Sequence, residues 1–133
     1  MSIVYAREDN LGADEYIAVV GSSGLNRPLG DRARVERMLA QANLIVTARE
    51  DGRLVGLARS LTDFCFCCYL SDLAVDKDCQ GKGIGKRLIE ETRREAGGPL
   101  TTTLLLSAPT AMTFYQGIKM PHADNCFLYR REK

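Results

Sequence analysis

The sequence predicts an α/β or α+β fold in which one mixed sheet is flanked by helices and contains at least one strand–helix–strand unit. Strand-like segments cluster in the first half of the chain and then alternate with helix-like segments. A strongly amphipathic segment at residues 84–96 lies between strand-like residues 64–75 and 101–106, which favours two parallel strands joined by a helix. The length of 133 residues suits a single domain spanning residues 1–133.

Four segments precede the first expected hairpin. Residues 2–7 predict a strand, and residues 12–20 predict a short helix. Residues 21–30 contain the Gly, Ser, Asn and Pro that are typical of loops. Asp31 is a suitable N-cap for a helix that extends to about residue 41. The apolar side chains of this helix have the spacing of a single face: Val35, Met38, Leu39 and Ala42.

The middle of the chain predicts a hairpin followed by a long strand. Residues 44–48 and 54–60 are apolar and rich in β-formers, and the Asp51-Gly52 pair between them favours a tight turn. After a second turn at Thr62-Asp63, residues 64–75 predict the long strand.

The last third of the chain alternates helices and strands. Residues 84–96 predict a helix whose inner face is formed by Ile84, Leu88, Ile89 and Thr92. Residues 101–106 have an uninterrupted strand pattern, which predicts a strand buried on both faces. Residues 109–116 suit a short helix with Pro in its first turn, and residues 126–130 predict a last strand.

The composition excludes several classes of protein. Hydrophobic residues make up 45% and charged residues 26%, which is ordinary for a soluble domain. A net charge of +1 and the absence of Trp argue against a nucleic-acid-binding protein. No apolar run approaches the ~20 residues of a membrane span. The first residues lack the apolar region of a signal peptide, so we expect a cytoplasmic protein.

The five cysteines do not predict a disulfide framework or a metal site. Their number is odd. Cys65, Cys67 and Cys68 have no second ligand pair at a finger-like spacing, and His122 is the single histidine. We therefore expect small apolar thiols within a strand and no bound metal.

The segment that carries chemistry is Gln80-Gly81-Lys82-Gly83-Ile84-Gly85-Lys86, between a predicted strand and a predicted helix. Glycines there allow positive φ and close approach of a ligand. Successive amides before a helix, together with the helix dipole, favour an anion such as a phosphate. The spacing fits neither the dinucleotide fingerprint nor the P-loop, which disfavours an NTP-binding protein. A glycine-rich helix entry without a ligand is the structural alternative.

The same segment resembles the acetyl-CoA signature of the GNAT superfamily of N-acetyltransferases. That signature is Gln/Arg-x-x-Gly-x-Gly/Ala after a strand, and here Leu73-Ala74-Val75 precedes Gln80, Gly83 and Gly85. A second, weaker match is Ala111-Met112-Thr113-Phe114-Tyr115, which resembles the family's Ala-x-x-Phe-Tyr helix. The similarity is strong from about residue 54 to residue 115 and generic before that.

The resemblance implies a fold and a co-substrate. It implies a mostly antiparallel sheet of six to seven strands with about four helices, splayed between the strands at residues 64–75 and 101–106. Acetyl-CoA would lie in the splay, with the backbone of Leu73, Ala74 and Val75 beside the pantetheine arm. The pyrophosphate would bind the amides of Gln80, Gly81, Lys82, Gly83, Ile84, Gly85 and Lys86.

The implied reaction is direct attack of a primary amine, on a small molecule or a protein, on the thioester. Tyr115 would protonate the CoA thiolate, and the amide of Leu73, helped by a strand bulge, would stabilise the oxyanion. Asp72 is our candidate general base, acting through water or with a raised pKa because an ordinary Asp titrates near ~3.9. Asp63 and His122 are lesser candidates for the base.

Two positions depart from the family pattern, and the acceptor stays open. Ala108 replaces a common Asn, and residues 116–120 replace the common continuation of the Phe-Tyr helix. We expect the acceptor to be set by residues 21–30, the helices that adjoin them and the strand residues 64–69. Arg27 and Arg59 could suit an acidic acceptor. The resemblance to the family also allows a homodimer. The alternative function is a sensor or interaction module that binds CoA or acetyl-CoA without turnover.

Overall fold

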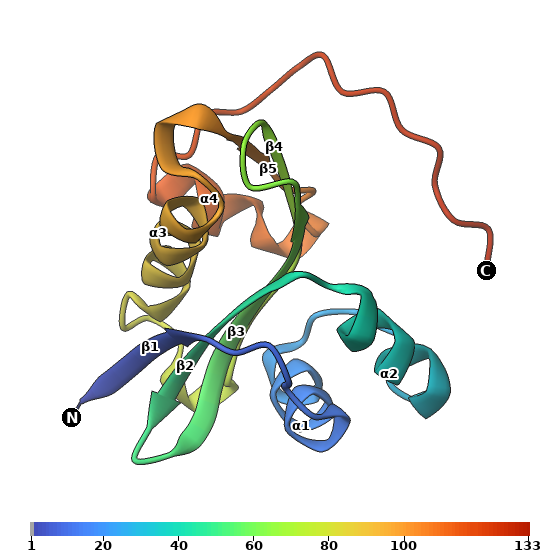
Figure 1. Cartoon of the computed structure of the whole chain (residues 1–133), viewed down its shortest axis with the longest axis vertical. Helices are drawn as coiled ribbons and strands as arrows, with labels where there is room; N and C mark the ends of the chain where they lie inside the picture. The colour runs from blue at the N-terminus through green and yellow to red at the C-terminus, as the bar shows by residue number, and fades with distance from the viewer. Residues whose placement is uncertain (1) are drawn as a thin grey trace.

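One sheet with the strand order β1-β2-β3-β4-β5 runs through the computed structural model, which describes residues 2–133 (Figure 1). Neighbouring strands from β1 to β4 are antiparallel, and β5 is parallel to β4. The strands are β1 (Ile3–Arg7), β2 (Leu44–Glu50), β3 (Arg53–Thr62), β4 (Cys67–Val75) and β5 (Thr102–Leu104). The helices are α1 (Ala13–Ser23), α2 (Arg32–Gln41), α3 (Ile84–Glu95) and α4 (Met112–Gly117).

Helices cover both faces of the sheet, because β2 and β3 bury side chains on both faces. Val46 and Ala48 of β2 belong to one apolar cluster with Leu88 and Ile89 of α3. Ile45 belongs to a second cluster, with the apolar sides of α1 and α2. Figure 1 shows α3 and α4 on one side of the sheet and α1 and α2 on the other. None of the helices in residues 2–133 is long and apolar enough to cross a membrane.

Local turn and capping signals are confirmed. Asp51 and Gly52 have φ values of 50° and 83°, as the tight hairpin between β2 and β3 requires. The Asp31 carboxylate accepts a hydrogen bond from the Arg34 amide at 3.1 Å and so caps α2.

The sheet opens between β4 and β5. Parallel pairing joins only Cys67–Tyr69 of β4 to Thr102–Leu104, so the rest of β4 has no strand partner on that edge within the described residues. The predicted strand–helix–strand unit and its splay are therefore confirmed.

Two strands are shorter than predicted. β4 begins at Cys67 rather than residue 64, because Phe64 has a left-handed φ of 64° and the Asp63 carboxylate accepts from the amides of Cys65, Phe66 and Cys67. β5 is not buried on both faces as its sequence predicted, since Leu104 is 47% exposed. Its three residues pair with β4 on one edge, and no strand in residues 2–133 covers the other edge.

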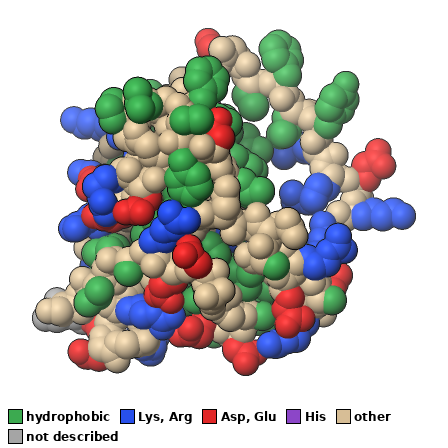
Figure 2. Space-filling view, viewed as in Figure 1, with side chains coloured by type: hydrophobic (Ala, Val, Ile, Leu, Met, Phe, Trp, Pro, Cys, Tyr) green, Lys and Arg blue, Asp and Glu red, His purple; other side chains and the backbone are tan. Residues whose placement is uncertain are grey.

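The predicted last strand at residues 126–130 does not form, and the predicted six to seven strands were too many: the described sheet has five. The chain after α4 extends away from the sheet in Figure 1, and Figure 2 shows hydrophobic side chains along it. Phe127 and Tyr129 are fully or almost fully exposed. A β-prone sequence forms a strand only where another strand accepts its hydrogen bonds, and this tail meets none.

One buried ionic cluster ties α1, the α1–α2 loop, β3 and β4 together. The fully buried Asp72 carboxylate accepts from Tyr16 Oη at 2.6 Å, Arg27 Nε at 2.6 Å and Arg59 Nε at 2.5 Å. Burial raises the pKa of Asp72, but the hydrogen bonds and charges of Arg59, Tyr16 and Arg27 outweigh it. The pKa of Asp72 therefore lies below its ordinary value.

We expect Asp72→Asn to be strongly destabilised, because removing one partner of a buried ion pair costs about 3–5 kcal/mol. Since the pKa is lowered by folding, this stabilisation is present above the unfolded value near ~3.9 and is lost as the pH falls through the folded value. Urea unfolding from neutral to acidic pH measures both effects. Asp9→Asn is the control, because Asp9 is in an exposed pair with Arg7. An Asp72→Asn loss that equals the control, or that does not shrink in acid, would contradict the assignment.

Candidate functional site

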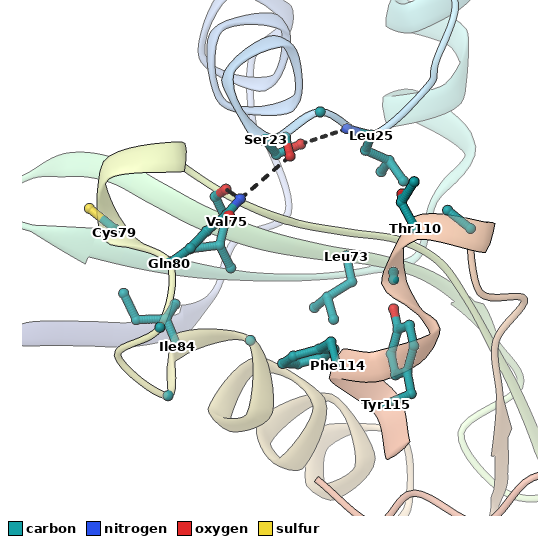
Figure 3. Close-up of a pocket in the computed structure, with 16 residues that line it drawn as sticks. Ser23, Leu25, Leu73, Val75, Cys79, Gln80, Ile84, Thr110, Phe114 and Tyr115 are labelled. Atoms are coloured by element: carbon teal, nitrogen blue, oxygen red, sulfur yellow. Dashed lines mark hydrogen bonds between the residues drawn. The ribbon is translucent and has the colours of Figure 1, made fainter. Parts of the chain in front are cut away.

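A cavity of about 420 Å³ lies on the open edge of β4 (Figure 3). Its walls come from the end of α1 and the following loop, the last residues of β4, the loop before α3, and the start of α4. Eight of the predicted site residues line it: Leu73, Val75, Gln80, Gly81, Gly83, Ile84, Gly85 and Tyr115. Ala74, Lys82, Lys86 and Asp72 are not among the lining residues.

At one end of the cavity, the loop before α3 presents backbone amides. Gly81 and Gly83 have φ values of 80° and 82°, in the left-handed region that glycine adopts without strain. Gly83 is the N-cap of the 12-residue helix α3, and no side chain caps that end. The first amides of α3 therefore lack a side-chain acceptor, and the helix dipole adds partial positive charge. This end of the cavity can hold an anionic phosphate group.

The loop is fixed by the side chain of Gln80. Its amide nitrogen donates to the carbonyl of Val75 at 3.0 Å and to the carbonyl of Ser23 at 3.4 Å (Figure 3). Gln80 thus connects the end of β4 with the end of α1. The side chain that matches the family signature has a structural task here, and the loop's anion-binding capacity comes from its backbone.

Gly85 is required by packing rather than by φ. A Cβ at this position would lie 2.9 Å from Phe114 Cζ, which is closer than real contacts allow. The small residue lets α4 approach the first turn of α3. Phe114 in turn makes an edge contact with Tyr115, with ring centroids 5.0 Å apart and an interplanar angle of 74°. Gly85 therefore helps to place Tyr115.

The open edge of β4 offers backbone groups to the cavity. Asp76 donates its N–H to the carbonyl of Val55 on the β3 side. The two-residue alternation of a strand then turns the backbone N–H groups of Leu73 and Val75 to the opposite edge, which is the cavity edge. Ala74 belongs to the β3 side, and its side chain is buried in the core beneath α1 and α2.

A bulge interrupts β4 before Leu73. Asp72 pairs with Arg59 and Leu70 pairs with Ser60, so Ser71 is the extra residue. Arg27 Nη2 donates to the Ser71 carbonyl at 2.6 Å, and Arg59 Nη2 donates to Ser71 Oγ at 3.1 Å. The same arginines that bind Asp72 therefore hold the bulge.

Tyr115 lies at the other end of the cavity from the amide loop. Its hydroxyl points into the cavity, beside Leu73 and toward Thr110 in Figure 3. Burial raises the pKa of Tyr115, and the positive charge of Arg27 lowers it by less. At neutral pH the group is a protonated phenol that can donate a hydrogen.

The geometry does not suit the general-base role predicted for Asp72. Its carboxylate is enclosed by Arg27, Arg59 and Tyr16, lies outside the cavity lining and has a lowered pKa, whereas a base needs access and a raised pKa. Arg27 and Arg59, predicted as contacts for an acidic acceptor, are bound to this carboxylate. The two lesser candidates for the base also lie outside the cavity lining. Asp63 accepts hydrogen bonds from the turn before β4, and His122 is exposed on the tail.

Several lining residues were not predicted as site residues. Ser23, Gly24 and Leu25 fall in the segment 21–30 that was expected to set the acceptor, but they were not predicted to line the cofactor cavity. They reach it because α1 ends at Ser23, three residues later than predicted, and Gly24 caps it with a φ of 87°. Phe114 belongs to the Ala-x-x-Phe-Tyr motif, but the motif alone did not mark it as a cavity residue. Its contact with Gly85, which places it there, joins positions too distant in the sequence to be predicted. Within residues 2–133, no group of three or more His, Cys, Asp or Glu side chains could hold a metal ion.

A family model describing the acetyltransferase (GNAT) domain matches residues 23–118. A curated relative from Glycine max, named histone acetyltransferase TAP1, is 44% identical over 45 residues, which is 34% of this chain and 20% of that protein. The match therefore spans about a fifth of the relative's length.

Solved structures share the fold across almost the whole chain. A GNAT-family acetyltransferase from Streptococcus pneumoniae has a TM-score of 0.78 at 17% identity, with 99% of this chain and 100% of that chain covered. An aminoglycoside N-acetyltransferase solved with CoA has a TM-score of 0.73 at 15% identity, with coverages of 99% and 96%. Because the family model spans well over half of the residues, including the amide loop and Tyr115, the chain belongs to the GNAT acetyltransferase family.

Proposed function

We propose that the chain is an acetyl-CoA-dependent N-acetyltransferase, a single domain over residues 1–133, that acetylates a primary amine of a small molecule or protein. One observation carries the proposal: a single cavity has an amide loop suited to a phosphate at one end and the hydroxyl of Tyr115 at the other. Membership of the GNAT family and the fold shared with an aminoglycoside N-acetyltransferase support an amine acceptor.

The residues fit acetyl-CoA along the length of the cavity. Backbone amides from Gly81 to Lys86 would hold the pyrophosphate, with Gly81 and Gly83 supplying the left-handed turns of the loop. The outward-facing backbone of Leu73 and Val75 would pair with the pantetheine amides, as an added strand pairs with a sheet edge. Ala108, which lines the cavity where the family often has Asn, offers no side-chain hydrogen bond.

The transfer itself needs three things from the protein. The acceptor must arrive as a neutral amine so that its nitrogen can form the new bond to the carbonyl carbon. The Leu73 amide, beside the Ser71 bulge, would donate to the carbonyl oxygen as negative charge develops there. As the carbon–sulfur bond breaks, Tyr115 would give its proton to the leaving sulfur.

Replacing Gly83 tests the amide loop. A Cβ at φ 82° costs about 1–2 kcal/mol. The loop can relieve this strain only by changing the directions of its backbone amides, which then bind the pyrophosphate less well. If the whole strain energy is lost from binding, Gly83→Ala binds acetyl-CoA roughly 5- to 30-fold more weakly in calorimetric titration. Gly12→Ala is the matched control, because Gly12 has ordinary φ, open space around its Cβ and no place in the cavity. Unaltered affinity in Gly83→Ala would argue for a purely structural loop.

Replacing Tyr115 tests the catalytic proposal. Tyr115→Phe keeps the ring contact with Phe114 but removes the proton donor, so we expect kcat to fall by about 10²–10⁴ with little change in KM for acetyl-CoA. Thiol release from acetyl-CoA, screened against a panel of amines, measures both constants, and Tyr129→Phe in the exposed tail is the control. Tyr115→Phe with full activity would refute the assigned role. Saturable acetyl-CoA binding by the wild type without turnover of any amine would favour a non-catalytic binding module.

A further inference from the structure

Arg27 reaches from the α1–α2 loop to β4. Its Nε donates to Asp72 Oδ1 and its Nη2 donates to the Ser71 carbonyl, both at 2.6 Å. Leu25, two residues earlier, and Leu73, two residues after Ser71, line the same cavity as Tyr115 (Figure 3). The guanidinium therefore clamps together the two segments that border the reacting end of the cavity.

Arg27 also supplies an excess positive charge at this place. The carboxylate of Asp72 is balanced by Arg59, whose side chain is 8% exposed, and Tyr16 is neutral because its pKa is raised. Arg27, with 21% of its side chain exposed, adds a second cation to one anion. No Asp, Glu, Lys or Arg is among the described cavity-lining residues. Burial raises the pKa of Tyr115, and the positive charge of Arg27 opposes that rise.

We propose that Arg27 is a positioning residue for acetyl transfer, which holds the Ser71 bulge in place and directs its charge toward Tyr115 so that the phenol can protonate the leaving CoA sulfur. This inference rests on the proposed function. When the carbon–sulfur bond breaks, its electron pair goes to sulfur, and the sulfur takes the phenol proton. The resulting phenolate is stabilised by Arg27 until a proton returns to it through solvent from the acetylated nitrogen.

The physical reason lies in the relative acidity of the two groups. An ordinary thiol has a pKa near ~8.5 and an ordinary phenol near ~10, so this proton transfer is unfavourable from the start. Burial raises the pKa of Tyr115 and widens that gap, whereas the nearby Arg27 charge narrows it. A fixed cation that is already held by Asp72 and Ser71 can act without rearranging during the reaction.

The test compares Arg27→Gln, which removes the charge, with Arg27→Lys, which keeps it. The tyrosinate absorbance of each protein, minus that of the same protein carrying Tyr115→Phe, follows the titration of Tyr115 without any acetyl-CoA. We expect this titration to move to higher pH in Arg27→Gln and to stay near the wild-type value in Arg27→Lys. For each pH unit of that shift we expect kcat to fall by up to about tenfold, while KM for acetyl-CoA changes little.

Arg32→Gln is the matched control, since Arg32 is an exposed arginine paired with Asp14. An unchanged Tyr115 titration in Arg27→Gln, or a loss confined to KM, would overturn the proposal in favour of a merely structural arginine. If Arg27→Gln does not fold, Arg27→Lys decides: a displaced Tyr115 titration, or a kcat far below the wild-type value although the titration is unchanged, would overturn it. Absence of acetyl transfer in the wild type would refute the proposed function, and the titration would still report whether Arg27 and Tyr115 are coupled.

Discussion

The buried carboxylate of Asp72 is the interaction on which the geometry of the cavity depends. It joins four segments, because Tyr16 comes from α1, Arg27 from the following loop, Arg59 from β3 and Asp72 itself from β4. A charge removed from water must be met by partners in fixed positions. Those partners also hold the Ser71 bulge, so the curvature of β4 and the position of the α1–α2 loop are set together.

The two ends of the cavity arise from different uses of glycine. Gly81 and Gly83 permit left-handed backbone, which turns successive amides in one direction and leaves the start of α3 uncapped. Gly85 instead removes a side chain that would collide with Phe114, so that α4 packs closely and carries Tyr115 to the open edge of β4. The short pairing of β4 with β5 leaves the space between these two ends.

The sequence predicted features that depend on neighbouring residues and missed those that depend on distant ones. The Asp31 cap, the Asp51-Gly52 turn, the inner face of α3 and the glycine loop are local, and all are present. The role of Asp72 depends on residues 13 to 56 positions away. The family resemblance therefore suggested a general base, and the local sequence could not reveal the enclosing arginines. The tail at residues 126–130 has the composition of a strand, but a strand also requires a partner that the local sequence does not specify.

The measurement that tests the account most directly is a titration of the isotope-labelled protein with acetyl-CoA, followed through the backbone amide resonances. The account predicts saturable binding with the largest shifts at the amides of residues 81–86, smaller shifts at Leu73 and Val75, and little change in the tail. ATP and NAD, which also carry phosphates, serve as comparison ligands. Saturable binding that leaves residues 81–86 unshifted, or no binding by the folded protein, would contradict the claim that this loop holds the pyrophosphate.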